Sequence, residues 1–248
     1  MDLLAQDLLY IVHSRMLVIG IVLLLLVIAT VVFIAALITT QWKLKKSYSN
    51  VLYSLVLSLE ARDRYSAGHS IRVAELSKQL AIKMGLKKKM VEIIYRAGLL
   101  HDIGKIGIPD SILLKKTKLN LQDMIKVSEH PLIASSLLKT VEKFYEKEIR
   151  IIEAHHERWD GQGYPRRLKQ DAIPLGAQIM AVADTYDAMT SDRPYRKALS
   201  MGDALTEISM NSGSQFNPLI VNQFVSLFKE KADKTQLGQD ILEIQARM

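Results

Sequence analysis

The sequence predicts an all-α protein: a helical bundle domain preceded by one N-terminal transmembrane helix and a linker helix. Three observations predict this class. Residues 17–38 carry no charged side chain. From Val51 onward apolar residues recur at three- and four-residue steps, the period of an amphipathic helix. No segment shows the apolar–polar alternation of a half-buried strand. Beyond the apolar span the 248-residue chain retains enough length for one domain with a single core.

Composition limits the function classes. The chain has no cysteine, which excludes disulfides, thiolate metal ligands and cysteine nucleophiles. A formal net charge of +7 favours anionic partners such as nucleotides or an anionic membrane face. Aromatic residues make up only 6% and do not alternate with a basic stripe, so we expect no nucleic-acid polymer as a partner.

The apolar run 17–38 would form a helix about 33 Å long, enough to cross a bilayer core. A secretory signal peptide is the alternative, but the run is longer than an h-region and no basic segment opens the chain. Lys43, Lys45 and Lys46 follow the run, whereas only Arg15 lies close before it. The positive-inside rule therefore predicts a short extracytoplasmic N-terminus at 1–16, Trp42 at the interface and a cytoplasmic C-terminal domain.

Residues 41–59 form the predicted linker helix. Their apolar positions recur at helical spacing at Val51, Leu52, Leu55, Val56 and Leu59. The helix can be a dimerising stalk, which would make the protein a homodimer, or it can pack on its own domain. The repeat is too short to define a coiled coil.

The predicted domain covers 60–231 and is helical nearly throughout, with a polar tail at 232–248. Gly85 is expected to end a helix over 71–84, and Asn120 with Asp123 to begin one over 121–138, which Pro131 should kink. The remaining predicted helices are 90–100, 141–157, 175–189, 201–210 and 218–229. Four glycines and prolines make 158–174 a predicted long loop, a length that is often functional.

The histidines are the main candidate functional residues of this sequence. Five of the six histidines fall within the predicted domain, and only His13 lies across the apolar run. The five are His69, His101, His130, His155 and His156. Asp102 adjoins the second of them, and Asp184 lies in an otherwise apolar stretch, where a buried carboxylate needs a partner. Such ligands without cysteine suit iron, manganese or zinc.

Each histidine also has an ordinary structural interpretation. His69, after Gly68, can simply begin a helix, and His130, before a proline, can be a hydrogen-bonded core residue. Taken together, five histidines and two aspartates exceed what one ion needs, so the sequence predicts two divalent ions and a bridging carboxylate. Adjacent His155 and His156 would point about 100° apart on a regular helix, so joint ligation requires a distorted helix end.

Several motifs extend this pattern across 60–229. They are RDRYSAGHS at 62–70, HDIGKIGIPD at 101–110, His-Pro at 130–131, HHERWDGQGYP at 155–165, Ala-Asp at 183–184 and SDRPYR at 191–196. With these motifs the domain resembles the HD-GYP family, a branch of the HD metal-dependent phosphohydrolases that cleaves cyclic di-GMP. The long loop with Gly163-Tyr164-Pro165 distinguishes this family from other HD enzymes.

The resemblance implies seven metal ligands: His69, His101, Asp102, His130, His155, His156 and Asp184. It implies Asp102 as the bridge between the ions and, with Lys105, as a catalytic residue, Lys105 contacting the scissile phosphate or supporting the leaving oxygen. Asp63 and Asp187 would orient ligands or cap helices. Some members bind a third ion through a glutamate four residues before the first histidine. Tyr65 stands there, so two ions, iron or manganese, are expected.

The expected substrate contacts are Lys105, Tyr164, Arg193 and Arg196. Guanidinium groups offer paired donors to phosphate, although without the resemblance both arginines could equally lie on a solvated loop. The ring of Tyr164 offers a stacking face for guanine. The loop around Tyr164 is also an expected contact for a protein partner.

The sequence departs from the family pattern at a few positions. Arg167, Gln170 and Ala134 stand where the family tends to have glycine, and Asn217 stands where it has aspartate. None of these changes removes a predicted ligand. They bear on loop geometry and substrate preference.

The expected function is that of a bacterial phosphodiesterase anchored in the cytoplasmic (inner) membrane by a single span. It would hydrolyse cyclic di-GMP to pGpG, and further to GMP, through a hydroxide activated by two metal ions. Two alternatives are an HD phosphohydrolase acting on another cyclic dinucleotide or a mononucleotide, and a receptor that binds cyclic di-GMP without cutting it and signals through 47–59.

Overall fold

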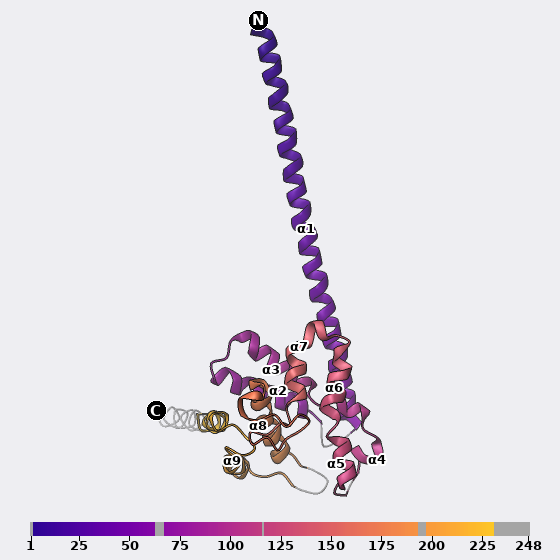
Figure 1. Ribbon diagram of the computed structural model, residues 1–248, viewed down its shortest axis with the longest axis vertical. Helices are drawn as coiled ribbons and strands as arrows, with labels where there is room; N and C mark the ends of the chain where they lie inside the picture. Colours follow the sequence, from indigo (N-terminus) through magenta and orange to yellow (C-terminus); the bar gives the residue numbers. More distant parts are fainter. Residues whose placement is uncertain (1, 63–66, 116, 193–196, 231–248) are drawn as a thin grey trace, which may run out of the picture. The chain divides into compact units, whose positions relative to one another are not determined.

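A computed structural model describes residues 2–62, 67–115, 117–192 and 197–230 (Figure 1). Every regular element within these ranges is a helix, and the only β feature described is an isolated bridge between Ser212 and Phe216. The all-α prediction is therefore confirmed. The chain divides into two compact units, Met1–Val51 and Leu52–Met248, which we describe separately.

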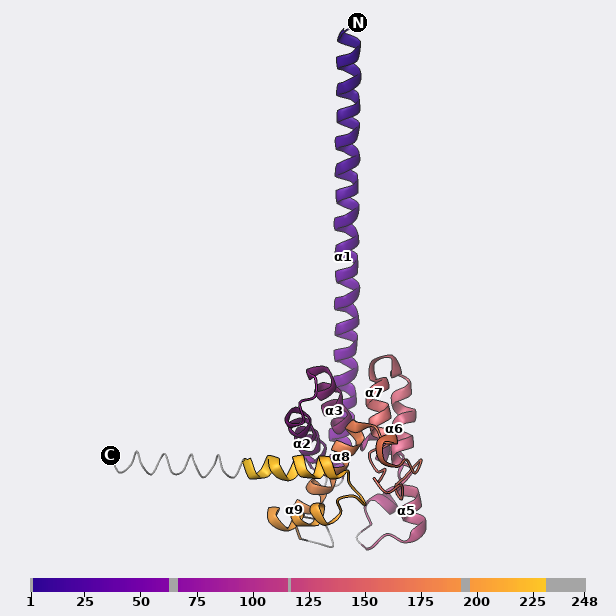
Figure 2. The same ribbon diagram turned by 60° about the vertical axis from the view of Figure 1, so that its left-hand side comes forward.

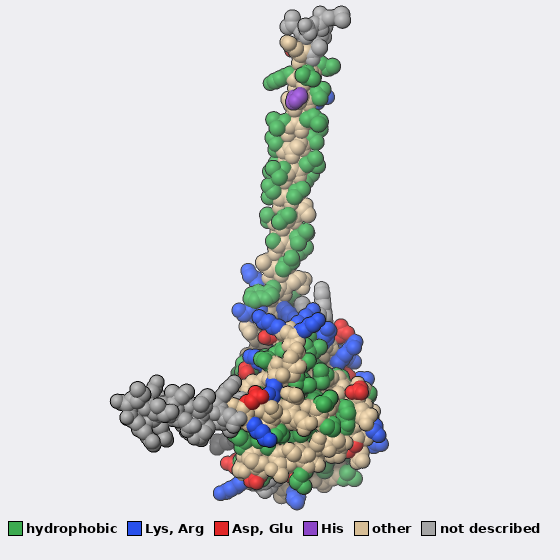
Figure 3. Space-filling view, turned by 90° about the vertical axis from the view of Figure 1, so that its left-hand side faces the viewer, with side chains coloured by type: hydrophobic (Ala, Val, Ile, Leu, Met, Phe, Trp, Pro, Cys, Tyr) green, Lys and Arg blue, Asp and Glu red, His purple; other side chains and the backbone are tan. Residues whose placement is uncertain are grey.

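Unit Met1–Val51 consists of the larger part of helix α1 (Asp2–Arg62). From Leu8 onward its leucine, isoleucine and valine side chains are exposed. Figure 3 shows hydrophobic side chains along most of the helix, with Lys and Arg side chains gathering toward its C-terminal part. By length and composition the helix can cross a membrane. It continues unbroken through both 17–38 and 41–59, so the division into a span and a linker remains a prediction.

The second unit begins with the last turns of α1, where Val56 and Leu59 are buried. Its core forms mainly from the apolar faces of α2 (His69–Lys83), α3 (Lys88–Leu100), α6 (His130–Lys139), α7 (Glu142–Glu153) and α8 (Leu175–Thr190). Helix α9 (Met201–Met210) and a helix over 218–230 add further buried apolar side chains. Helix α2 packs against α3 and α8, and α6 packs against α7 (Figures 1 and 2). Because these five helices pack into one bundle, the ends of several of them lie close together.

Short elements connect and complete the bundle. A 3-10 helix η1 (Ile103–Gly107) follows α3 and lies against α6. A Cβ at Gly104 would lie 1.9 Å from the carbonyl oxygen of His130, so only glycine allows this approach. The other elements are α4 (Asp110–Leu113), α5 (Leu121–Val127) and η2 (Gln170–Ala172).

Two predicted helix boundaries are wrong. The predicted helix 121–138 is two helices, because α5 ends at Val127 and α6 begins at His130. Pro131 does not kink a helix: it occupies the first turn of α6, where its missing N–H needs no partner. The predicted helix 141–157 ends at Glu153. The N-cap pair is confirmed, since Asp123 N–H donates to Asn120 Oδ1 at 2.8 Å and Asn120 N–H to Asp123 Oδ2 at 3.2 Å.

Candidate metal centre

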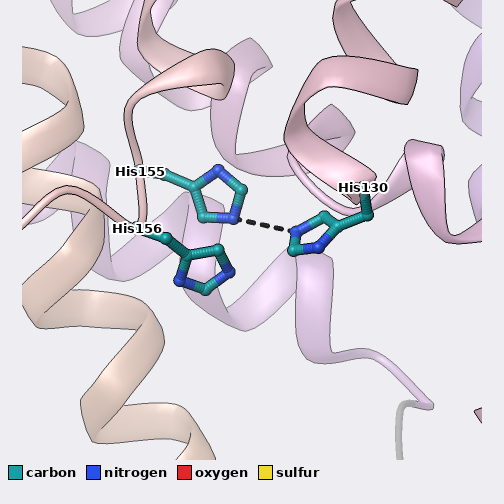
Figure 4. A group of neighbouring side chains, drawn as sticks. All are labelled: His130, His155 and His156. Atoms are coloured by element: carbon teal, nitrogen blue, oxygen red, sulfur yellow. Dashed lines mark hydrogen bonds between the residues drawn. The ribbon is translucent and has the colours of Figure 1, made fainter. Parts of the chain in front are cut away.

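The structure brings all seven predicted ligand residues together, although they come from five parts of the chain. His69 begins α2, and His130 begins α6. The pair His101-Asp102 directly follows α3, the pair His155-His156 follows α7 after Ala154, and Asp184 lies within α8. Three groups have ligand atoms within 4.8 Å of one another: His69, His101 and Asp102; His101, His155 and Asp184; and His130, His155 and His156. Figure 4 shows the last group.

Helix ends orient three of the histidines in the same way. Each of these rings donates from Nδ1 to the carbonyl oxygen three residues earlier, a terminal helix carbonyl that lacks an intrahelical partner. The distances are 2.7 Å from His101 to Gly98, 2.8 Å from His130 to Val127 and 2.6 Å from His155 to Ile152. Because a carbonyl only accepts, Nδ1 carries the proton, and Nε2 is left to face the centre.

The orientation of these nitrogens fits a metal ion. His101 Nε2 is buried and has no hydrogen-bond partner among the described residues, an arrangement that costs about 1–3 kcal/mol unless a ligand binds there. His130 Nε2 and His155 Nε2 lie 3.3 Å apart (Figure 4). With both Nδ1 atoms protonated, two neutral rings would direct lone pairs at each other. Two nitrogens bound about 2.1 Å from one ion are roughly 3 Å apart, so a cation resolves this conflict.

Burial keeps the paired histidines in the form that binds metal. It lowers the pKa of His155 well below its ordinary value and lowers the pKa of His156 to about 3. It also lowers the pKa of His130, against the opposing effect of Asp102. These imidazoles are therefore neutral at physiological pH and can offer a lone pair to a cation.

Asp102 lies between the histidine groups. Its Oδ2 is 3.6 Å from His69 Nε2 and 3.5 Å from His101 Nε2, while its Oδ1 is 3.4 Å from His130 Nε2. Lys105 Nζ donates to Oδ2 at 2.5 Å. Burial raises the pKa of Asp102, but the charge of Lys105, the largest opposing effect, holds it well below its ordinary value. The carboxylate is therefore ionised and presents its two oxygens to different histidines.

His69 is held by two aspartates of α8. Its Nδ1 donates to Asp187 Oδ2 at 2.8 Å, and its Nε2 lies 3.4 Å from Asp184 Oδ1. Arg72 fixes Asp187 from behind through Nε at 2.6 Å and Nη2 at 3.0 Å. Burial lowers the pKa of His69, but Asp184 and Asp187 outweigh it and raise the pKa to about 10. A metal cation bound to His69 in place of this proton would likewise supply positive charge beside the carboxylates of Asp184 and Asp187.

A cavity of about 490 Å³ opens over this centre. Its lining includes His69, Asp102, Lys105, His156, Tyr164 and Asp184. The ring of Tyr164 lies against that of His156, with centroids 4.8 Å apart and planes 30° from parallel. Tyr164 also lines a neighbouring cavity of about 690 Å³, together with Glu129, Leu132 and Arg167. Lys105 and Tyr164 therefore border the space above the predicted ligands.

The loop around Tyr164 is held by a residue that the sequence analysis missed. Glu157 is 4% exposed and accepts hydrogen bonds from the backbone N–H groups of Arg166 at 2.7 Å and Leu168 at 3.0 Å. Its only sequence signal was a carboxylate next to the paired histidines. Arg72 was also missed, because its partner Asp187 is 115 residues away in the sequence.

Two departures from the family pattern coincide with left-handed backbone. Arg167 has φ +56° and Gln170 has φ +51°, a conformation that costs a residue with a Cβ about 1–2 kcal/mol. This explains why glycine suits both positions. The loop is formed here without it.

Some predicted residues cannot be placed. Asp63, Tyr65, Arg193 and Arg196 lie outside the described residues, as does the tail 232–248. The roles assigned to Lys105, Tyr164 and Asp187 remain predictions, although each of these residues borders the centre or contacts one of its histidines.

Comparisons with known proteins agree with this fold. The family model described as HD domain matches residues 54–220. A cyclic di-GMP phosphodiesterase of Thermotoga maritima is 41% identical over 191 residues, covering 77% of this chain and 52% of the relative. A 3'3'-cGAMP-specific phosphodiesterase 2 of Vibrio cholerae is 34% identical over 188 residues, covering 75% of this chain and 36% of the relative.

One solved structure, described as an HDG"Y"P protein from Bdellovibrio bacteriovorus, has a TM-score of 0.57 at 18% identity, covering 75% of this chain and 62% of the other. At that identity the likeness shows the fold alone. Fold and site thus define an HD-type helical domain. The chain belongs to the HD domain family, and its domain is similar to those of the HD-GYP-like phosphodiesterases. It spans about half the length, or less, of the curated relatives it matches.

Proposed function

We propose that the protein is a metal-dependent phosphodiesterase that hydrolyses a cyclic dinucleotide, with cyclic di-GMP as the first candidate. The observation that carries this proposal is the convergence of imidazole nitrogens and carboxylates around Asp102, whose two oxygens face different histidines. Similarity to a cyclic di-GMP phosphodiesterase of Thermotoga maritima supports the substrate. Similarity to a 3'3'-cGAMP-specific enzyme makes that nucleotide the second candidate.

Two divalent ions fit the ligand groups. His69, whose Nε2 lies 3.4 Å from Asp184 Oδ1, would hold one ion together with His101 and Asp184. His130, His155 and His156 would hold the other, and Asp102 would contribute to both. Nitrogen and oxygen ligands without thiolates suit iron or manganese. When bound, the ions supply an activated water and positive charge for the phosphate oxygens.

The chain's own residues would position the substrate. Lys105 borders the cavity beside Asp102, so its ammonium group can contact a phosphate oxygen while it keeps Asp102 ionised. The exposed part of the Tyr164 ring can stack on one guanine, and the neighbouring cavity that shares Tyr164 has room for the second base. Arg193 and Arg196 remain proposed phosphate contacts outside the described residues.

The reaction consumes one water per bond cleaved. The water oxygen forms a new bond to phosphorus, the bond from phosphorus to the ribose 3′ oxygen breaks, and that oxygen leaves as a hydroxyl after taking a proton. One cycle gives linear pGpG. A second hydrolysis would give GMP.

The test of this proposal compares substrates on the full chain, purified in detergent without oxygen and loaded with Mn(II) or Fe(II). Chromatography would follow cyclic di-GMP, 3'3'-cGAMP and pGpG. We expect cyclic di-GMP to be consumed fastest, and we expect Lys105→Gln to lose turnover while keeping its ions. Faster consumption of 3'3'-cGAMP would reassign the substrate, and tight binding without product would indicate a receptor.

We also propose that α1 crosses the bacterial inner membrane once, with the domain in the cytoplasm. The helix has the length and hydropathy for a span, and lysines at 43, 45 and 46 follow the apolar run. A homodimer through the linker segment 41–59 and a protein partner at the Tyr164 loop remain proposals of the same kind. A reporter fused to the C-terminus would test the orientation, and an extracytoplasmic signal would contradict it.

A further inference from the structure

The N-terminus of α2, which carries His69, is held by a side chain from the last turn of α1. Glu60 is 7% exposed, and its two oxygens accept from the backbone on both sides of His69. Gly68 N–H donates to Oε2 at 2.9 Å, and Ser70 N–H donates to Oε1 at 2.8 Å. The carboxylate therefore binds the backbone N–H groups immediately before and immediately after His69.

Helix α2 has no cap of its own. Its N-cap residue is Gly68, which has no side chain, and its first turn contains no acidic residue. The first N–H groups of a helix lack intrahelical partners and carry partial positive charge, so a carboxylate suits them well. Hydrogen bonds to an ionised group are roughly twice as strong as neutral ones. Glu60 of α1 thus performs for α2 the capping that α2 does not provide.

Separate contacts fix the ring and the backbone of His69. Asp187 accepts from the ring at Nδ1, and Arg72 holds Asp187. Arg72 Nη1 also donates to the carbonyl oxygen of Ala67 at 2.9 Å, so the chain just before His69 is tied on that side too. Of these contacts, only those of Glu60 come from α1.

We propose that Glu60 is a positioning residue of the metal centre. By fixing the backbone around His69, it places Nε2 at 3.6 Å from Asp102 and 3.4 Å from Asp184. The inference rests on the proposed metal centre but not on the identity of the nucleotide. Because Val56 and Leu59 of the same α1 segment are buried in the core, a displacement of this segment relative to α2 would be transmitted directly to a metal ligand.

An ordinary structural role for Glu60 makes a different prediction. If the carboxylate only stabilises the fold, its loss would lower the melting temperature and leave the ion affinity of the folded protein unchanged. Glu148 provides a matched control, because it is a carboxylate 2% exposed on α7 whose partner is Arg96 at 2.6 Å. Its loss removes a buried charged contact that does not involve a predicted ligand.

The experiment titrates Mn(II) into the metal-free full chain in detergent and follows free Mn(II) by electron paramagnetic resonance. The variants are Glu60→Ala, Glu60→Gln, Glu148→Ala and Glu148→Gln, each with a melting temperature measured in chelator. We expect Glu60→Ala to bind the ions about 10–100-fold more weakly, the range for residues that orient ligands. Glu60→Gln, which keeps one acceptor oxygen, should show a smaller loss. The Glu148 variants should bind as wild type despite lower melting temperatures.

Wild-type affinity in both Glu60 variants would overturn the inference, as would an equal loss of affinity in the matching Glu148 variants. If Glu60→Ala does not fold, the comparison of Mn(II) affinity between Glu60→Gln and Glu148→Gln tests the inference by itself. Failure of the wild type to bind Mn(II) would overturn the metal centre and this inference together. Binding without nucleotide turnover would contradict only the proposed reaction, so the two failures are distinguishable.

Discussion

The metal centre and the loop 158–174 border the same cavity but are built in different ways. In the centre, the rings of His101, His130 and His155 each cap a terminal helix carbonyl, so their orientation follows from helix ends fixed in the core. In the loop, Glu157 organises the backbone, and Arg167 adopts left-handed backbone. From this comparison we expect the centre to tolerate little change and the loop to tolerate more.

The sharpest test of this contrast removes one ligand. We expect His155→Ala to lower turnover about a hundredfold or more and to reduce the ions bound per chain, because even residues that only orient ligands are worth 10–100-fold. Ion content by mass spectrometry and turnover of cyclic di-GMP check this prediction. His13→Ala, the histidine outside the domain, is the matched control. Full ion content in His155→Ala would show that the centre is as tolerant as the loop.

Loss of the loop's organiser should have a smaller and different effect. Glu157→Gln leaves one acceptor oxygen for the N–H groups of Arg166 and Leu168. A hydrogen bond to a charged group is worth about 1.5–3 kcal/mol, so we expect KM to rise about tenfold with ion content unchanged. Steady-state kinetics with metal analysis measure both. A fall in bound ions without a change in KM would make Glu157 part of the centre instead.

The stability of the metal-free protein should also depend on pH. The folded pKa of His69, about 10, lies above the ordinary value of 6.5, so the stability from its protonated form is complete below pH 6.5. We expect this stability to be lost as the pH rises from 6.5 through about 10. Urea unfolding in chelator measures it, with His69→Gln for comparison. A wild type no more pH-dependent than His69→Gln across this range would contradict the assigned contacts with Asp184 and Asp187.

The smallest expected effect tests the tolerance of the loop. Arg167→Gly and Gln170→Gly should each raise the free energy of unfolding by about 1 kcal/mol, because glycine adopts left-handed backbone without the Cβ penalty but loses more entropy on folding. Thermal unfolding of the ion-loaded protein measures this gain. Arg166→Gly, at a neighbouring position without positive φ, should not raise the free energy of unfolding. Destabilisation by both Arg167→Gly and Gln170→Gly would mean that their side chains hold the loop.

Residues and their spacing predicted the fold class, the helix 201–210 and the group of histidines and aspartates that could hold two ions. Helical periodicity is a local signal, and a clustered histidine inventory points to one site. The helix ends at Val127 and Glu153 were missed, because the rings of His130 and His155 hold carbonyls at both breaks. Glu60 was missed as well, since its capping of α2 depends on contacts between two helices that no local pattern encodes.

The most direct measurement counts ions and turnover together in the full chain and in Asp102→Asn. If Asp102 joins two ions, the wild type should bind two iron or manganese ions per chain and convert cyclic di-GMP to pGpG. Asp102→Asn should lose bound metal and all measurable turnover, because a neutral amide offers one acceptor oxygen where the carboxylate presents two. Two bound ions and undiminished turnover in Asp102→Asn would contradict the assignment of Asp102 as the residue that joins the two ions.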